Sequence, residues 1–284
     1  MTPADFEYLA SILKDRSGLS IGPDKTYLLE SRLTPVARKN NLDDLDALVA
    51  EVRRSKKEAM LCEITEAMTT NESFFFRDAT PFEIFEKAIL PDLLEARASR
   101  KSLRIWSAAC STGQEAYSLA MILREMAPKL AGWRIEIVGT DISKEVLEKS
   151  KAGIYSQFEV QRGLPINYLM KYFTQVSELW QIDAAIRAMV TYKEFNLLKD
   201  LKSLGTFDII FCRNVLIYFD QPTKTQVLDA MSGILAKDGC LFMGAAETVL
   251  GISDVFKPVS GHRGVYEMGV TSAAAKSFGK VAAG

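Results

Sequence analysis

The beginning of the chain repeats apolar residues at the three- and four-residue spacing of amphipathic helices. The repeat runs from Phe6 to about Met68 and includes Phe6, Leu9, Ile12 and Leu13, then Tyr27, Leu28, Leu33 and Val36, then Leu45, Leu48, Val49 and Val52. Polar turns, "SGLSIGPD" and "KNNLDD", separate the helical stretches, and no strand-like alternation interrupts them. The sequence therefore predicts a small all-helical domain over residues 1–75.

Beyond this domain, apolar strands alternate with helices. Strands are expected at residues 103–109, 135–140, 207–212, 240–244 and 264–268, and helices near 114–127, 143–151 and 222–236. Such alternation implies right-handed crossovers and a mainly parallel sheet covered by helices, which predicts an α/β domain over residues 76–270. Residues 165–195 are expected to form a small inserted β element, and the tail, 271–284, to be disordered.

Composition and charge describe an ordinary globular protein. The 284 residues are 48% hydrophobic and 25% charged, and they suffice for one large and one small domain. With 35 Lys and Arg against 36 Asp and Glu, the net charge of -1 gives no general attraction for nucleic acid. The first residues, "MTPADFEYLASILKDRSG", carry too many charges for a signal peptide or a membrane span, so we expect a cytoplasmic protein without membrane insertion.

The number and spacing of cysteine and histidine residues limit the kinds of metal site and catalytic site that the chain could form. Cys62, Cys110, Cys212 and Cys240 lie far apart, without the paired spacing of a zinc site, and are expected to be small buried apolar residues. His262 is the single histidine, which excludes a histidine-rich metal site, and we expect no bound metal. A nucleophilic Cys110 would have to recruit this histidine, so a cysteine hydrolase is the weakest of the alternatives.

In a parallel α/β sheet, ligands bind beyond the carboxyl ends of the strands. The first strand leads into "SAACSTGQEAY", where Gly113 could let the backbone approach a ligand and Glu115 stands in the first turn of a helix. This turn lacks the GxGxxG pattern of a dinucleotide site, and Glu115 could instead stabilise the helix dipole.

Asp141 follows the second strand, in "VGTDISKEVLEKS". A carboxylate at this position can accept hydrogen bonds from ribose hydroxyls. Helix capping is the alternative, although Ser143 is better placed to cap the next helix. We therefore favour Asp141 as a ligand-binding residue.

Two further segments place polar residues beside apolar runs. In "FDIIFCRNVLIYFD", Arg213 and Asn214 fall just past a strand that is expected to be buried on both faces. Tyr218 could bring a phenolic hydroxyl to the same edge, or it could pack with that hydroxyl at the surface. In "MTTNESFFFRD", Arg77 follows three aromatic residues that could pack between domains.

Taken together, "TTNESFFFRD", "RIWSAACSTGQEAYSLAM", "GTDIS", "FNLL" and "FDIIFCRNVLIYFD" closely resemble, in this order and spacing, the chemotaxis receptor methyltransferases, the CheR family of glutamate O-methyltransferases. The likeness runs from about Phe6 to Met268. It implies a class I S-adenosylmethionine-dependent methyltransferase fold, in which a mostly parallel seven-stranded sheet has helices on both faces. It also implies methyl transfer from S-adenosylmethionine to glutamate side chains of bacterial chemoreceptors, with S-adenosylhomocysteine as the product.

The resemblance assigns the residues of the cofactor pocket. They are Asn71, Ser73, Arg77, Glu115, Asp141, Asn196, Leu197, Arg213 and Asn214. Asp141 would hold the ribose, and Asn196 and Leu197 would flank the adenine. Arg77 and Glu115 would bind the methionine end, and Cys110 would merely line the pocket.

Fewer residues are assigned to the methyl acceptor, the glutamate carboxylate. Tyr218 is expected to orient the acceptor carboxylate, with help from an arginine before the first strand. The stretch "EARASRKSLR" offers Arg97 and Arg100, of which we assign Arg100. No strong general base is needed, since a glutamate carboxylate with a pKa of about 4.3 is already ionised at neutral pH.

The helical domain resembles the family's receptor-docking domain. Arg32, Arg38 and Lys39 would face acidic residues on the cytoplasmic helical domain of a receptor, unless they form an ordinary solvated face. Relatives that bind a receptor's C-terminal pentapeptide carry a glycine-containing loop in the inserted β element, whereas "YFTQVSELWQID" has no glycine. We therefore expect methylation of receptors without this tether. No long heptad pattern demands a dimer, so we expect a monomer.

Two other classes of function stay open. The protein could bind S-adenosylmethionine and dock to signalling proteins without turnover, although Arg77, Asn214 and Tyr218 argue against that hypothesis. It could also methylate RNA or a small molecule, and the neutral charge disfavours RNA.

Overall fold

The computed structural model describes residues 1–269, so the predicted tail, 271–284, lies outside the described residues. The chain divides into two compact units: Met1–Thr70 with Tyr218–Lys224, and Asn71–Ile217 with the residues from Thr225 onward. The division falls between Thr70 and Asn71, before the boundary after residue 75 that the sequence suggested. The physical reason is Phe75, whose fully buried ring belongs to the hydrophobic core of the second unit.

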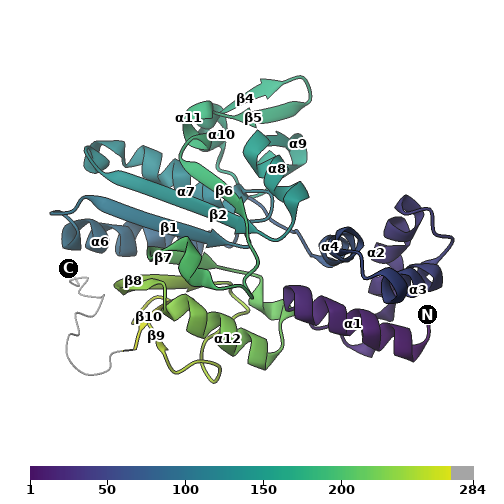
Figure 1. Cartoon of the computed structure of the whole chain (residues 1–284). Helices are drawn as coiled ribbons and strands as arrows, with labels where there is room; N and C mark the ends of the chain where they lie inside the picture. Colours follow the sequence, from purple (N-terminus) through teal and green to yellow (C-terminus); the bar gives the residue numbers. More distant parts are fainter. Residues whose placement is uncertain (270–284) are drawn as a thin grey trace. The chain divides into compact units, whose positions relative to one another are not determined.

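Four helices build the first unit (Figure 1). They are α1 (Pro3–Ser17), α2 (Thr26–Lys39), α3 (Leu45–Ser55) and α4 (Glu58–Met68), with a short 3-10 turn, η1 (Pro23–Lys25), before α2. Thr2 begins α1 with a capping box that it shares with Asp5, and Gly18 ends it in the left-handed conformation at φ 79°. The apolar stripes meet in a core whose fully buried members include Leu9, Leu13, Leu29, Leu33, Leu48 and Ile64, and the prediction of an all-helical domain is confirmed.

The first unit also includes a segment from much later in the chain, Tyr218–Lys224. The backbone N–H of Ser20 donates to the carbonyl oxygen of Tyr218 at 2.9 Å. Lys14 and Asp220 form an ion pair with 2.7 Å between Nζ and Oδ2. The hydrogen bond from Lys14 is the largest cause that lowers the pKa of the Asp220 carboxyl to about 2.

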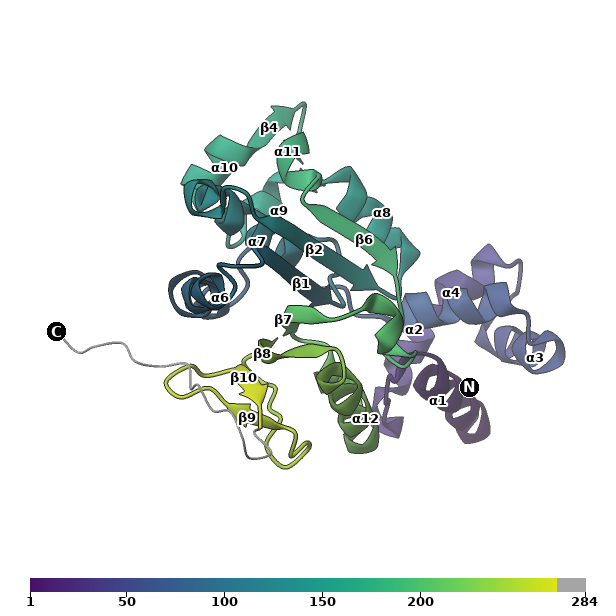
Figure 2. The same cartoon turned by 60° about the vertical axis from the view of Figure 1, so that its left-hand side comes forward.

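A seven-stranded sheet forms the centre of the second unit, in the order β6-β2-β1-β7-β8-β10-β9 (Figures 1 and 2). The strands are β1 (Ser102–Ala108), β2 (Arg134–Asp141), β6 (Val190–Glu194), β7 (Phe207–Cys212), β8 (Leu235–Met243), β9 (Phe256–Pro258) and β10 (Val265–Met268). The first five strands of the order run parallel to one another. β10 pairs antiparallel with β8, and β9 pairs antiparallel with β10. This arrangement confirms the predicted mostly parallel seven-stranded sheet.

Helices alternate with the strands along the chain, as the pattern predicted, and three helical segments of the second unit come before the first strand. The helical segments that accompany the main sheet are α5 (Thr80–Ile84), a π-helical turn η2 (Phe85–Ile89), α6 (Leu90–Ala96), α7 (Gln114–Glu125), η3 (Ala127–Leu130), α8 (Lys144–Ala152), η4 (Leu201–Leu204), η5 (Leu216–Tyr218) and α12 (Gln221–Ser232). The core between α7 and the sheet includes the fully buried Leu119, Ile105 and Ile137. No helix in residues 1–269 is long and apolar enough to cross a membrane.

A smaller antiparallel sheet lies between α8 and β6 in the chain, as Figure 1 shows. Its strands are β3 (Ile154–Ser156), β5 (Leu179–Ile182) and β4 (Phe173–Val176), accompanied by α9 (Gln157–Gln161), α10 (Ile166–Tyr172) and α11 (Ala184–Arg187). The predicted inserted β element exists, but its bounds differ from 165–195. It begins at Ile154, and Val190–Glu194 belongs to the main sheet because it pairs in parallel with β2.

Candidate functional site

The carboxyl ends of the parallel strands bring the segments that follow them to one edge of the main sheet. Ala108, the last residue of β1, is paired with Thr140 of β2 and with Cys212 of β7. Cys212 is in turn paired with Met243 at the end of β8. The loops that begin at residues 109, 142, 213 and 244 therefore start side by side, and we call this edge the carboxyl edge.

Arg213 is the centre of an ion-pair network at the carboxyl edge. Its Nη1 donates to Glu115 Oε2 at 2.9 Å, and its Nη2 donates to the carbonyl oxygen of Arg77 at 2.7 Å and to Asp78 Oδ2 at 2.8 Å. Ser107 Oγ donates to the other oxygen of Glu115 at 2.7 Å. The Arg213 side chain is only 1% exposed, and its buried Nε has no hydrogen-bond partner.

The turn after β1 is conformationally strained. Ala109 and Ser111 take left-handed φ angles of 55° and 49°, which residues with a side chain rarely adopt. Phe76, Asp78 and Asn214, on the neighbouring segments, also have positive φ. Strain of this kind persists where the surrounding structure enforces it, and it concentrates at ligand-binding sites.

Asp141 is buried and fixes the turn after β1. Its Oδ2 accepts the backbone N–H of Ser111 at 2.8 Å, and its Oδ1 accepts the backbone N–H of Ser143 at 3.0 Å. Ser143 is the N-cap residue of α8, as predicted, but its side chain makes no capping bond. These bonds hold the buried carboxylate in a fixed position at the end of β2.

The first residues of the second unit, from Asn71 onward, contact the same turn. Ser111 Oγ donates to the carbonyl oxygen of Asn71 at 2.8 Å, and the half-buried Ser73 follows two residues later. Arg77 reaches the network only through its backbone carbonyl. Its guanidinium donates to the carbonyl oxygen of Glu72 at 2.7 Å, so the charged group that the sequence assigned to the methionine end has an internal partner.

Asn196 and Leu197 also lie beside Asp141. The last residues of β2 and β6, Asp141 and Glu194, are paired, and the backbone N–H of Phe195 donates to the carbonyl oxygen of Asp141 at 2.8 Å. Asn196 Oδ1 accepts the N–H of Leu198 at 3.0 Å, while the Leu197 side chain is buried. The residues assigned to the adenine thus adjoin the residue assigned to the ribose.

Glu247 is a central residue that sequence reasoning missed. One of its oxygens accepts the backbone N–H groups of Val215, Leu216 and Ile217 at 2.8–3.3 Å. The other accepts those of Asn214 at 2.7 Å and of Gly244 at 2.8 Å. The available signal was its position just after β8, at the carboxyl edge. Asp78, Ser107 and Ser111 were missed as well, because their roles depend on contacts between segments.

Arg100 does not lie at the carboxyl edge. It precedes β1, and the seven residues of that strand, at about 3.3 Å each, separate the two edges of the sheet by about 20 Å. Arg100 and the buried Arg97 both donate to Asp208 at the start of β7. The assignment of Arg100 to the acceptor carboxylate is therefore corrected: its ion pair joins the amino ends of neighbouring strands.

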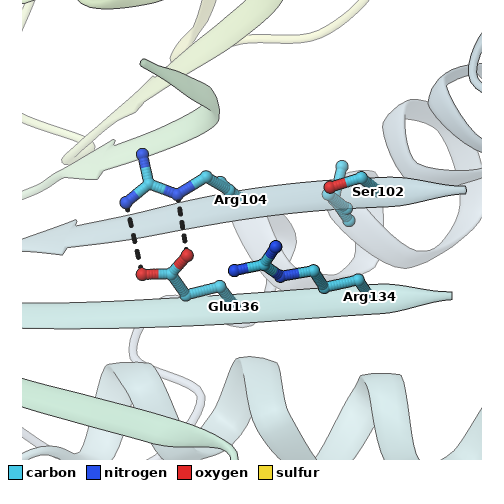
Figure 3. Close-up of a pocket in the computed structure, with 5 residues that line it drawn as sticks. Ser102, Arg104, Arg134 and Glu136 are labelled. Carbon is cyan, nitrogen blue, oxygen red and sulfur yellow. Dashed lines mark hydrogen bonds and ion pairs between the residues drawn. The ribbon is translucent and has the colours of Figure 1, made fainter. Parts of the chain in front are cut away.

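A recess of about 310 Å³ lies at this same amino end (Figure 3). It is lined by Ser102, Leu103, Arg104, Arg134 and Glu136. Arg104 binds both oxygens of Glu136, at 2.8 and 3.2 Å, and this pairing lowers the pKa of the Glu136 carboxyl. No predicted site residue lines the recess, so it is unrelated to the carboxyl edge.

The residues predicted to meet a receptor behave differently from one another. Arg32 is half-buried and turned inward, where its Nη1 donates to the carbonyl oxygens of Met68 and Thr69 at 2.8 and 2.9 Å. Arg38 and Lys39 are exposed, and Lys39 is paired with Glu63 at 2.8 Å. The guanidinium of Arg32 therefore closes the end of α4, and none of the described contacts tests its assignment to receptor contact.

Tyr218 lies in the first unit, and none of the described contacts tests its assigned role. Cys110 and Cys212 are buried, as predicted, and burial raises the pKa of each thiol well above its ordinary value. Cys62 is exposed, contrary to the prediction. Residues 1–269 contain no group of three or more His, Cys, Asp or Glu side chains that could hold a metal ion.

The chemistry of the carboxyl edge fits S-adenosylmethionine. Buried Asp141 lies at the end of β2, where a carboxylate can accept hydrogen bonds from ribose hydroxyls, and Leu197 offers an apolar surface beside it for a base. Glu115 carries a negative charge that suits an ammonium group, and the unpartnered Nε of Arg213 is a donor without an internal acceptor. These are the groups that the parts of this cofactor require.

Comparisons with known proteins agree with this site. Residues 71–265 match the family described as "CheR methyltransferase, SAM binding domain", and residues 4–69 match "CheR methyltransferase, all-alpha domain". The chain is 38% identical over 266 residues to chemotaxis protein methyltransferase 1 of Pseudomonas aeruginosa, covering 92% of this chain and 96% of that protein. It is 37% identical over 270 residues to the chemotaxis protein methyltransferase of Vibrio anguillarum, covering 93% and 97%. The chain therefore belongs to the CheR family of S-adenosylmethionine-dependent methyltransferases.

Proposed function

We propose that this protein transfers methyl groups from S-adenosylmethionine to glutamate side chains of bacterial chemoreceptors and forms glutamyl methyl esters. The supporting observation is the convergence of Glu115, Asp141 and Arg213 at the carboxyl edge of a chain that belongs to the CheR family. The relatives named above are chemotaxis protein methyltransferases, which favours a receptor as the methyl acceptor.

The carboxyl edge supplies binding and orientation. When bound, the cofactor provides an electrophilic methyl group on a sulfonium centre. Asp141 holds the ribose, Leu197 packs beside the adenine, and Glu115 binds the ammonium group, while Arg213 keeps Glu115 in place. In-line approach of an ionised carboxylate then needs positioning and exclusion of water more than a base.

Tyr218 is proposed to orient the acceptor carboxylate through its phenolic hydroxyl. It follows directly on Asn214–Ile217, whose backbone N–H groups are held by Glu247. An ion pair that bound the acceptor tightly would lower its nucleophilicity, so a neutral hydroxyl suits this role better than a second arginine.

Receptor docking is proposed for the exposed face of α2, through Arg38 and Lys39. Both side chains are exposed, and the ion pair of Lys39 with Glu63 at the surface contributes little stability, so it can exchange for an acidic receptor residue. Arg32 is left out of this surface because its guanidinium is occupied by carbonyl oxygens.

Methylation without a pentapeptide tether is also proposed. The hairpin between β4 and β5 is closed by only two residues, Ser177 and Glu178, and Ser177 has a φ of 56°. This short turn has no glycine-containing loop to receive a peptide. Removing the last residues of a receptor should therefore leave its rate of methylation unchanged.

The proposal is tested by titrating S-adenosylhomocysteine into the protein by calorimetry and then supplying methyl-labelled S-adenosylmethionine with cytoplasmic receptor fragments. Binding followed by base-labile release of labelled methanol is the expected result. Binding without transfer would favour a cofactor-binding protein without turnover. Label that resists mild base would indicate another acceptor and contradict the glutamyl ester.

A further inference from the structure

Two buried hydroxyls hold the turn after β1 from its inner side. Tyr155 Oη, on β3, donates to the carbonyl oxygen of Thr112 at 2.8 Å. Ser150 Oγ, on α8, shares its single proton between the carbonyl oxygens of Ser111 at 2.9 Å and Val146 at 2.8 Å. Neither donor side chain is accessible to solvent. Because an unpaired buried carbonyl is costly, these two bonds fix the direction in which the backbone of the turn points.

Gly113 lets the turn after β1 pack closely against side chains of β6 and α8. A Cβ atom on Gly113 would lie 2.6 Å from Tyr192 Oη and 3.0 Å from Ser150 Cβ, and the residue has a φ of 88°. The sequence suggested that the glycine admits a ligand. The structure instead shows that its missing side chain makes room for Tyr192 and Ser150.

Tyr155 also joins the turn to the segment that carries Asn71 and Arg77. Its ring meets that of Phe75 edge to face, with 5.0 Å between centroids, and Phe75 meets Phe173 of β4 in the same way at 5.5 Å. In the small sheet, Tyr155 is paired with Trp180 of β5. Tyr155 of the small sheet thus contacts both the turn after β1 and the segment of residues 71–77, which carry residues assigned to the cofactor site.

We propose that Tyr155 is a positioning residue for cofactor binding and that the small sheet supports the cofactor site through it. The inference rests on the proposed placement of the cofactor at the carboxyl edge. Tyr155 does not touch the cofactor. Its hydroxyl holds the Thr112 carbonyl and its ring holds Phe75, so the strained turn is already in its binding conformation before the cofactor arrives.

Tyr172 offers a matched control for this proposal. It lies on α10, within the same insertion, is nearly as buried, and donates its hydroxyl to Glu125, away from the turn. Tyr155→Phe and Tyr172→Phe each delete one hydroxyl hydrogen bond. Both variants should lower the melting temperature, but only Tyr155→Phe should weaken S-adenosylhomocysteine binding, by about fivefold, the equivalent of one hydrogen bond.

Kinetics and exchange separate positioning from general stability. For Tyr155→Phe we expect the KM for S-adenosylmethionine to rise by the same factor, with kcat within about twofold of the parent value. Backbone amides of residues 110–113 should exchange with deuterium faster in Tyr155→Phe than in Tyr172→Phe. Ser150→Ala, which removes the hydroxyl that the carbonyl oxygens of Ser111 and Val146 share, should act in the same direction as Tyr155→Phe.

Asp141→Asn distinguishes failure of this inference from failure of the proposed site. If Asp141→Asn weakens binding while Tyr155→Phe and Ser150→Ala do not, the site stands and the positioning role is wrong. If Asp141→Asn leaves binding unchanged, the placement of the cofactor is wrong, and the inference falls with it. Equal weakening by Tyr155→Phe and Tyr172→Phe would reduce the effect to loss of stability and also overturn the inference.

Discussion

Arg213 and Glu115 form an ion pair between two segments that are almost a hundred positions apart in the chain, with 2.9 Å between Nη1 and Oε2. The arginine side chain is almost completely buried, and the glutamate is mostly so, at 12% exposure. The same guanidinium also binds Asp78. The two carboxylates compensate its charge, so the pair can survive burial and still offer one glutamate to a ligand.

Replacing Glu115 by Gln should weaken S-adenosylhomocysteine binding by about 10- to 100-fold, because a charge-assisted hydrogen bond contributes about 1.5–3 kcal/mol. Arg213 keeps its partner Asp78, so the fold should persist. Calorimetry measures the affinity, and circular dichroism checks the fold. Unchanged affinity in a folded variant would remove Glu115 from the cofactor site.

Replacing Glu247 by Gln should destabilise the protein by about 1–3 kcal/mol, because the amide nitrogen would face backbone N–H donors that now meet a carboxylate oxygen. Glu194→Gln is the control, since this side chain is 54% exposed and only loosely paired with Lys144 at 3.5 Å. Urea unfolding compares the two variants. Equal stability of both would mean that Glu247 does not hold the segment after β7.

The Lys14–Asp220 ion pair gives the stability a defined acid dependence. The pKa of Asp220 is about 2 in the folded protein against 3.8 for an unperturbed carboxyl, so its contribution is complete above 3.8 and is lost as the pH falls toward 2. The free energy of unfolding of the parent minus that of Asp220→Asn should therefore be constant near neutrality and shrink below about pH 4. Denaturant titrations from pH 2 to 7 measure it, and a pH-independent difference would contradict the assignment.

Cys110 provides a test against nucleophilic catalysis. Its thiol is buried, and desolvation is the main reason why its pKa lies well above the ordinary value, so a reactive thiolate is disfavoured. Cys110→Ser should retain most methyl-transfer activity and lose about 1 kcal/mol of stability through burial of a hydroxyl. Complete loss of activity with the fold intact would revive the hydrolase hypothesis.

Local pattern was sufficient for most of the architecture. Buried strands such as β7 are continuous apolar runs, and the helical spacing of the first unit is unbroken, so both could be predicted. The strand β6 was harder to predict, because in "VTYKE" only Val190 is buried and the remaining residues are half-buried or exposed. A sheet-edge strand of this kind is recognised through its partner, β2.

The role of a site residue could be predicted where its position near the end of a strand determines that role, and not where a distant contact partner determines it. Asp141 ends β2, Glu115 and Arg213 come shortly after β1 and β7, and the parallel topology brings them together. The role of Arg100 depended on which edge of the sheet it occupies, and that of Arg32 on the distant end of α4. Such long-range contacts leave no local signal in the sequence.

Phe75 determines where the chain can be cut. Its ring is fully buried in the second unit, between Tyr155 and Phe173, although it precedes every strand and helix of that unit. A fragment that begins at residue 76 would leave a void of the size of a phenylalanine ring, at a cost of about 3–5 kcal/mol. A fragment that begins at Asn71 keeps the ring, so five residues of apparent linker decide whether the catalytic half can be produced alone.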